Sequence, residues 1–212
     1  MMAGKFIAFE GGEGTGKSTQ ARLLSNSLQS AGADVVLTRE PGGTPGAEAI
    51  RSLLLDPPGD GWGARAEALL FAAARSDHVE KLIRPALDRG AWVITDRYLD
   101  SSRAYQGGAG GIGDDAVLGL HAIGSGGLRP DVTFLISVPP ELIAERLAKR
   151  DGGTSDAIGG REAAYHQKVA ETFLKMAEAE PDRFVVIDGE GTALAVHERI
   201  LAALKPFLGG TQ

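Results

Sequence analysis

Residues Glu10–Thr19, EGGEGTGKST, set the architecture of this chain. They follow an apolar run, Lys5 to Phe9, and precede Gln20 to Leu28, where leucines recur at helical spacing. The pattern G-x-x-x-x-G-K-[ST] is met in the strand, turn and helix setting that it needs, by Gly11, Gly16, Lys17 and Ser18. This combination predicts a phosphate-binding loop at the start of a helix.

Each position of the loop has a physical role in holding phosphate. Glycines let the backbone adopt positive φ and come close to the anion, so that successive N–H groups point at it. Lys17 can reach the β- and γ-phosphates, and Ser18 can ligate Mg²⁺. The alternative is an ordinary glycine-rich turn with an exposed lysine. The full motif favours a nucleoside triphosphate site, for ATP, formed by Gly11, Gly12, Glu13, Gly14, Thr15, Gly16, Lys17, Ser18 and Thr19.

Length and composition exclude several classes of protein. A chain of 212 residues suits a single domain, 1–212, with at most a small insertion. It has no cysteine, which excludes disulfides and thiolate zinc sites and fits a cytoplasmic location. The net charge of -6 argues against a nucleic-acid surface. No run approaches the ~18 apolar residues of a membrane span, so we expect no membrane partner.

Five short β-rich runs alternate with helical stretches along the chain. Near-continuous apolar strands separated by amphipathic helices predict a doubly wound parallel sheet covered on both faces, a three-layer α/β/α fold. Ligands of such a fold bind at the carboxyl ends of the strands. The expected strands are Lys5–Phe9, Asp34–Thr38, Ala91–Thr95, Asp131–Ser137 and Arg183–Ile187.

Charged residues follow the second and third strands. In Thr38–Thr44, TREPGGT, the proline and glycines hold Arg39 near the strand end, where it either contacts phosphate or belongs to a solvated Arg39–Glu40 loop. Asp96 ends a buried apolar strand beside the phosphate loop and is placed to hold Mg²⁺ or its waters. The alternative is a structural Asp96–Arg97 ion pair.

Two helices carry further candidates. The helix expected over Ala64–Leu87 has an apolar surface broader than one stripe, which favours a symmetric homodimer through it. Phe71 and Arg75 share one of its faces, and Phe71 is either a core residue or a ligand stack. The second helix, DSSRAYQ, presents one side made of Ser102, Tyr105 and Gln106, and we expect the following GGAGGIG, residues 107–113, to be a flexible loop.

A glycine-rich segment, residues 151–162, interrupts the last third of the chain. Basic residues flank it, with Arg146, Lys149 and Arg150 before and Arg161 at its end. Mobile glycines between cations suggest a lid that closes on phosphate and excludes water. A surface insertion without such a role is the alternative.

These features narrow the class of reaction that the protein could catalyse. A GTPase would read guanine with Asn-Lys-x-Asp, yet the one asparagine, Asn26, is followed by Ser27. An ATPase module would not need separate arginines at two strand ends and in a lid. Their placement instead suggests a second anion opposite the ATP, an acceptor phosphate.

Taken together, these motifs resemble those of the thymidylate kinase (dTMP kinase) family. The resemblance runs from Phe6 through Asp188 and is carried by Phe9–Thr19, Thr38–Thr44, Arg51–Asp56, Leu70–Arg75, Asp96–Tyr98 and Ser101–Gly107. It implies transfer of the γ-phosphoryl group of ATP to dTMP with Mg²⁺, which yields dTDP and ADP, in a homodimer. A kinase for another monophosphate, such as dUMP or dGMP, and a non-catalytic ATP-binding subunit are the alternatives.

By position, the resemblance implies a role for each residue on the acceptor side. Arg39 and Arg97 would clamp the acceptor phosphate, and Glu13 would contact the acceptor sugar or its Mg²⁺. Phe71 would stack on thymine, while Arg75 and Gln106, helped by Ser102, would hydrogen-bond the base. Tyr105 would crowd the sugar 2′ position. Catalysis would thus involve Lys17, Arg97, Arg39, Glu13 and a lid arginine, Arg161 or Arg150, with Ser18 and Asp96 at the metal.

The lid departs from the family pattern. The family has Asp-Arg-Ile/Phe-Glu here, whereas this chain has Asp156-Ala157-Ile158-Gly159, with alanine in place of arginine. Either Arg150 or Arg161 would then supply the transition-state cation, or the lid closes differently, and the preceding glycine hinge favours Arg161. On that hypothesis Arg161→Ala lowers kcat by ~10³ or more while dTMP binding changes little.

Overall fold

A five-stranded parallel sheet forms the centre of the structure, with strand order β2-β3-β1-β4-β5. The computed structural model describes residues 4–151 and 157–208, apart from the side chains of residues 149–151 and 208. The strands are β1 (Phe6–Glu10), β2 (Val35–Arg39), β3 (Trp92–Asp96), β4 (Val132–Ser137) and β5 (Phe184–Asp188). All five predicted strands are present, and each begins one residue later than predicted. Four of the strands end on a charged residue, because pairing with the neighbouring strand extends that far. Arg39 of β2, for example, pairs with Asp96 of β3.

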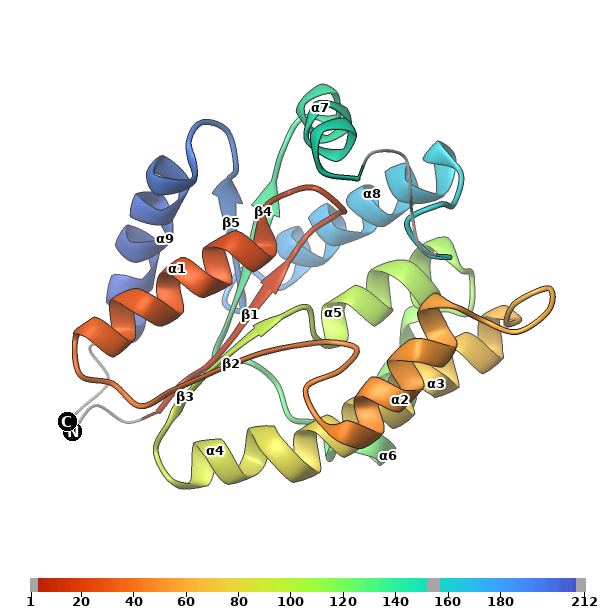
Figure 1. Cartoon of the computed structure of the whole chain (residues 1–212), viewed down its shortest axis with the longest axis horizontal. Helices are drawn as coiled ribbons and strands as arrows, with labels where there is room; N and C mark the ends of the chain where they lie inside the picture. The colour runs from red at the N-terminus through yellow and green to blue at the C-terminus, as the bar shows by residue number, and fades with distance from the viewer. Residues whose placement is uncertain (1–3, 152–156, 209–212) are drawn as a thin grey trace.

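Helices cover both faces of this sheet, as the alternation of side chains along β1 requires. On one face Ile7 and Phe9 pack in a core with α1 (Lys17–Ser30) and α9 (Ala193–Leu208), which lie on the same side of the sheet (Figure 1). On the other face Phe6 and Ala8 pack against the opposite helical layer. The doubly wound three-layer α/β/α fold is thereby confirmed. Among the described helices, none is both long enough and apolar enough to span a bilayer.

The second layer contains most of the remaining helices. The predicted helix over 64–87 is one helical run in three parts, with a π-helical turn in its middle. The run that carries Ser102 and Gln106 also passes into a π-helix. The elements are α3 (Ala64–His78), η1 (Val79–Ile83), α4 (Arg84–Asp88), α5 (Leu99–Ser102), η2 (Arg103–Ala109) and α6 (Asp114–Ser125). The others are α2 (Pro45–Leu55), α7 (Pro140–Asp151) and α8 (Ala163–Ala179).

The prediction of a loop over residues 107–113 is wrong for its first part. Gly107 and Gly108 continue the π-helix η2 because this segment packs closely on α8, where a Cβ at Gly108 would lie 2.5 Å from Thr172 Oγ1. Glycine here permits close approach of two helices instead of mobility. Helix α6, which follows directly, is not predicted by the sequence pattern. Of the predicted lid, residues 152–156 lie outside the described part of the chain, and 157–160 form turns.

Candidate active site

The loop between β1 and α1 has the backbone of a phosphate-binding loop. Gly11 has φ 139°, and a Cβ there would lie 2.7 Å from the Ile136 carbonyl oxygen, so only glycine fits. Gly16 adopts the left-handed conformation, with φ 100°, at the N-cap of α1. The loop therefore curls in front of the helix N-terminus, where free N–H groups and the helix dipole favour an anion.

Lys17 lies within this loop. Its side chain is buried, and its ammonium group donates a 2.6 Å hydrogen bond to the Gly12 carbonyl, which also accepts from the Thr15 hydroxyl. Burial, and then repulsion by Arg97, lower the pKa of Lys17 to about 8, although Asp96 and Glu13 oppose the shift. The group stays largely cationic at neutral pH and faces the site at which phosphate oxygens would replace the carbonyl.

Asp96, at the tip of β3, accepts a short hydrogen bond from the Ser18 hydroxyl through Oδ2. Its other oxygen, Oδ1, is buried and has no hydrogen-bond partner among the described residues. An orphaned carboxylate oxygen beside a hydroxyl ligand fits Mg²⁺, which takes few protein oxygens and completes its shell with water and phosphate. The two residues predicted for the metal therefore lie together.

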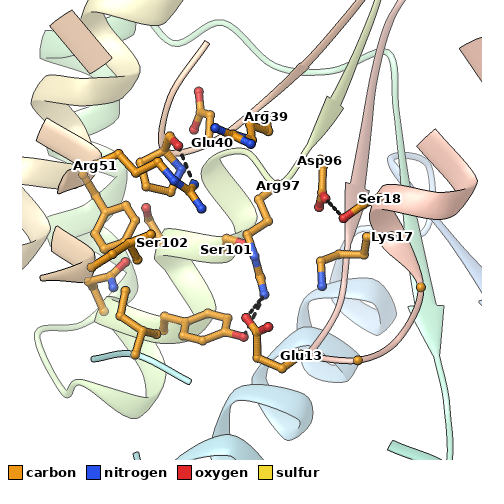
Figure 2. A pocket seen from close by; sticks show the side chains of 18 of the residues that line it. Glu13, Lys17, Ser18, Arg39, Glu40, Arg51, Asp96, Arg97, Ser101 and Ser102 are labelled. Carbon is orange, nitrogen blue, oxygen red and sulfur yellow. Dashed lines mark hydrogen bonds and ion pairs between the residues drawn. The ribbon is translucent and has the colours of Figure 1, made fainter. Parts of the chain in front are cut away.

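Arg97 occupies the middle of the site (Figure 2), between Lys17 and Ser18 on one side and Arg51 and Ser102 on the other. Its guanidinium group donates 2.5 Å to Glu13, 3.0 Å to the Ser101 hydroxyl and 3.2 Å to the Gly11 carbonyl. Burial alone would lower the pKa of Arg97, but Tyr105, Glu13 and Asp96 outweigh it and raise the pKa. Arg97 pairs with Glu13, so the alternative of an Asp96–Arg97 ion pair is not what the structure contains.

Arg97 has a positive φ of 69°, the one such non-glycine residue in the described part of the chain. This conformation is unfavourable for a side chain with a Cβ and has to be held by its surroundings. The Arg97 N–H donates to the Phe9 carbonyl, and the Thr95 hydroxyl donates to the Arg97 carbonyl. The next N–H, of Tyr98, donates to the buried Glu10 carboxylate. The end of β1 thus fixes the direction in which Arg97 points.

A cleft of about 540 Å³ joins these groups to the second half of the site. Arg39 lines it at the end of β2 and is held by Glu48 of α2 at 3.3 Å. Ser102 lies at the end far from Lys17 (Figure 2), and Phe71, Tyr105 and Gln106 also line the cleft, so Phe71 faces it as well as packing on the core. The other predicted residues in its wall are Glu13, Gly14, Gly16, Lys17, Ser18, Thr19, Asp96 and Arg97.

Arg75 does not line the cleft but lies directly behind it. Its Nη2 donates to the Ser102 hydroxyl at 2.9 Å, and its Nε donates to Glu40 at 2.7 Å. His78 Nδ1 lies 3.0 Å from the same carboxylate, and all three residues are buried. The alternative of a solvated Arg39–Glu40 loop is therefore wrong for Glu40, whereas Arg39 is exposed.

Of the two candidate lid arginines, the structure describes the side chain of Arg161. Arg161 contacts Glu67 of α3 as an ion pair and donates 2.6 Å to the Tyr165 hydroxyl, and it is not among the residues of the cleft wall. The side chain of Arg150 lies outside the described residues. Arg146 of α7, named above only as a flank of the lid, lines the cleft beside the phosphate loop and donates to the Thr15 and Gly189 carbonyls.

Sequence reasoning missed several groups of the site. Arg51 lines the cleft and donates to the Pro41 carbonyl, and Ile158 closes it from the lid side. Glu67 is buried beside Gln106. Glu67 precedes Phe71 by four residues, and that spacing places it on the same helix face, a signal that could have found it.

A parallel sheet with a glycine-rich loop at its switch point, a buried lysine in that loop and a carboxylate on the neighbouring strand defines a P-loop nucleotide-binding protein. Comparison with known proteins gives the family. Residues 9–200 match the family model described as "Thymidylate kinase". The chain therefore belongs to the thymidylate kinase family, as the resemblance predicted, and is a kinase.

Individual relatives agree over the whole chain. It is 53% identical over 207 residues to a thymidylate kinase of Rhizorhabdus wittichii, which covers 98% of this chain and 100% of the relative. It is 45% identical over 206 residues to one of Bradyrhizobium sp., with 97% and 91% covered. A crystal structure of thymidylate kinase from Ehrlichia chaffeensis superposes with a TM-score of 0.77 at 32% identity, and covers 95% of this chain and 99% of its own.

Proposed function

We propose that this protein transfers the γ-phosphoryl group of ATP to dTMP, with Mg²⁺, and releases dTDP and ADP. One observation carries the proposal: the Arg97 guanidinium lies in the same cleft as Lys17, with Arg39 at its edge. Lys17 belongs to the triphosphate loop, and Arg97 and Arg39 lie opposite it. A site for two phosphate groups that face each other is what phosphoryl transfer between nucleotides needs.

The donor half of the site would hold ATP. The N–H groups of Gly11–Thr19 would cradle its phosphates, and Lys17 would exchange its bond with the Gly12 carbonyl for the β- and γ-phosphate oxygens. Ser18 and Asp96 would hold Mg²⁺. When bound, this ion neutralises charge on the phosphate oxygens and orients them.

The acceptor half would hold dTMP. Arg39 and Arg97 would bind its phosphate, Glu13 its sugar or the metal, and Tyr105 would exclude a 2′-hydroxyl. Phe71 would stack on the base, and Ser102 and Gln106 would hydrogen-bond it from the cleft wall. Arg75 would support this set from behind, because its guanidinium holds the Ser102 hydroxyl in place.

The chemistry then needs alignment more than proton transfer. A phosphate monoester with second pKa near ~6 is largely a dianion at neutral pH, so no general base is required. One of its oxygens attacks the γ-phosphorus, the bond to the β-bridging oxygen breaks, and the electron pair leaves on ADP. Arg97, Lys17 and a further arginine near the phosphate loop would balance the charge that develops.

The test is a coupled ADP-release assay with ATP, Mg²⁺ and a panel of acceptors: dTMP, dUMP, dGMP and none. We expect release that depends on dTMP, with the highest kcat/KM for dTMP. ADP release in the absence of any acceptor would favour an ATPase module. No ADP release with any of the acceptors would favour a non-catalytic subunit.

A variant tests the acceptor clamp. Arg39→Ala should raise KM for dTMP by about 10- to 100-fold, the value of one hydrogen bond to a charged group, with KM for ATP little changed. Arg22→Ala, which removes an exposed arginine of α1, is the matched control. Equal effects on both KM values would contradict an acceptor role for Arg39.

A further inference from the structure

Glu67 of α3 makes two contacts that no part of the proposed reaction uses. Its Oε1 accepts a 2.9 Å hydrogen bond from Gln106 Nε2, and its Oε2 forms the ion pair with Arg161. Glu67 and Gln106 are both buried, with residue exposures of 6% and 2%. One carboxylate therefore joins the residue expected to read the base to the arginine at the end of the lid.

The ion pair fixes which way this hydrogen bond runs. A side chain whose second oxygen contacts a guanidinium is a carboxylate, and a carboxylate can only accept hydrogen bonds. Gln106 must therefore present its NH₂ group to Glu67. The NH₂ group and the oxygen of a side-chain amide have nearly the same shape, so either could occupy a given place. Here the Glu67 carboxylate determines which of them faces it.

The opposite end of the amide then points elsewhere. Among the described residues, no hydrogen bond is made to Gln106 Oε1, and Gln106 lines the cleft. The cleft therefore meets a carbonyl oxygen at this place, which binds an N–H donor and repels a lone pair. Ser102, four residues earlier, accepts from Arg75, so its own hydroxyl hydrogen is available to a carbonyl.

We propose that Glu67 is a specificity-determining positioning residue. By holding the Gln106 amide in one orientation, it selects pyrimidines with an N3–H beside a C4 carbonyl, thymine and uracil, and rejects cytosine. Cytosine has a lone pair at N3 where thymine and uracil have an N–H, so its N3 would face the Gln106 carbonyl oxygen with no hydrogen to share. This inference rests on the proposed function, since it assumes a base at the far end of the cleft.

The test uses an isosteric variant, Glu67→Gln. An amide at position 67 can either accept from Gln106 or donate to it, so the Gln106 amide is no longer held one way. We expect the ratio of kcat/KM for dCMP to that for dTMP to rise about tenfold, the value of one neutral hydrogen bond. The dUMP to dTMP ratio should stay within about twofold, because both bases carry N3–H and O4.

Two further variants make the result decisive. Glu178→Gln makes the same chemical change at an exposed position of α8 and should leave both ratios as in the wild type. Glu67→Asp shortens the side chain by one methylene, which withdraws the carboxylate oxygen from Gln106, and should also raise the dCMP to dTMP ratio. This variant replaces Glu67→Gln if the latter does not fold. An unchanged dCMP to dTMP ratio in a folded variant at Glu67 overturns the inference. Wild-type protein without dTMP-dependent turnover would instead overturn the proposed function itself.

Discussion

Glu10, the last residue of β1, is a buried carboxyl group that holds the turn after β3. It accepts hydrogen bonds from the Tyr98 and Ser101 N–H groups and from the Ser101 hydroxyl. Burial, and then repulsion by Asp100, raise the pKa of Glu10 from 4.5 to about 7. The folded protein therefore binds this proton more tightly than the unfolded chain. The stability that the proton contributes is fully present at low pH and is lost as pH rises from about 4.5 to 7.

We expect the free energy of unfolding of the wild type to fall from about pH 5 to pH 7 by about 1 to 3 kcal/mol more than that of Glu10→Gln. The glutamine variant cannot ionise, and every other titrating group is common to the two proteins. Urea denaturation at a series of pH values measures the difference. Parallel pH profiles would show that Glu10 ionises in the folded protein at its ordinary pKa.

Individual site residues differ in how far the sequence could predict them. The phosphate loop and Asp96 are set by local spacing and by the end of one strand, and the structure brings Ser18 and Asp96 together as predicted. Arg146 and Glu67 were missed because packing between distant segments positions them: Arg146 meets Gly189 across 43 residues, and Glu67 meets Arg161 across 94. Local periodicity carries no information about such pairs.

Secondary-structure elements were predicted well where hydrophobic periodicity is strong and poorly where glycines interrupt it. The helix α6 was missed behind a run of glycines, although Asp114 and Asp115 in its first turn and the left-handed Gly126 at its C-cap are helix signals. The π-helical register of η2 follows from its packing on α8 and has no local signature. This register matters because η2 carries Tyr105 and Gln106 into the cleft wall.

The start of α8 is joined to the base end of the cleft by Arg161. The Arg161 guanidinium donates to the Tyr165 hydroxyl, which in turn donates at 2.8 Å to the Tyr105 carbonyl of η2. The same guanidinium forms an ion pair with Glu67 of α3. To reach ATP, Arg161 would have to leave these partners. The cation that neutralises transferred charge is then more simply supplied by another arginine near the phosphate loop.

We therefore expect Arg161→Ala to raise KM for dTMP, about tenfold, and to lower kcat by less than about tenfold. Without its cation the buried Glu67 is unpaired and no longer held against Gln106, which costs acceptor binding. Steady-state kinetics with each substrate varied measures this, and Lys168→Ala, an exposed cation of α8, is the control. A loss of ~10³ in kcat with an unchanged KM would assign Arg161 to the transition state, as the sequence alone suggested.

Exposed apolar surface bears on how the protein assembles. Exposed large apolar side chains occur on three neighbouring helices: Leu53 of α2 is 43% exposed, Leu69 of α3 57% and Ile123 of α6 86%. These helices pack together in one layer, with α3 in contact with both α2 and α6 (Figure 1). On the hypothesis of a homodimer through the helix over 64–87, a second copy of the chain would bury these side chains. The same helix carries Glu67, Phe71 and Arg75, so a partner packed on its outer side would restrain the base end of the cleft.

We expect size-exclusion chromatography with light scattering to give twice the 22.1 kDa of one chain. Leu69→Glu and Ile123→Glu should shift the protein toward monomer, because a carboxylate would lose its hydration without a partner in the interface. Leu194→Glu, at a residue of α9 that is 65% exposed on the other side of the sheet, should remain a dimer. If dimer contacts restrain α3, the monomeric variants should also show a raised KM for dTMP at low protein concentration. A wild type that is monomeric at every concentration would remove both expectations, because α3 would then need no partner to hold its side of the cleft.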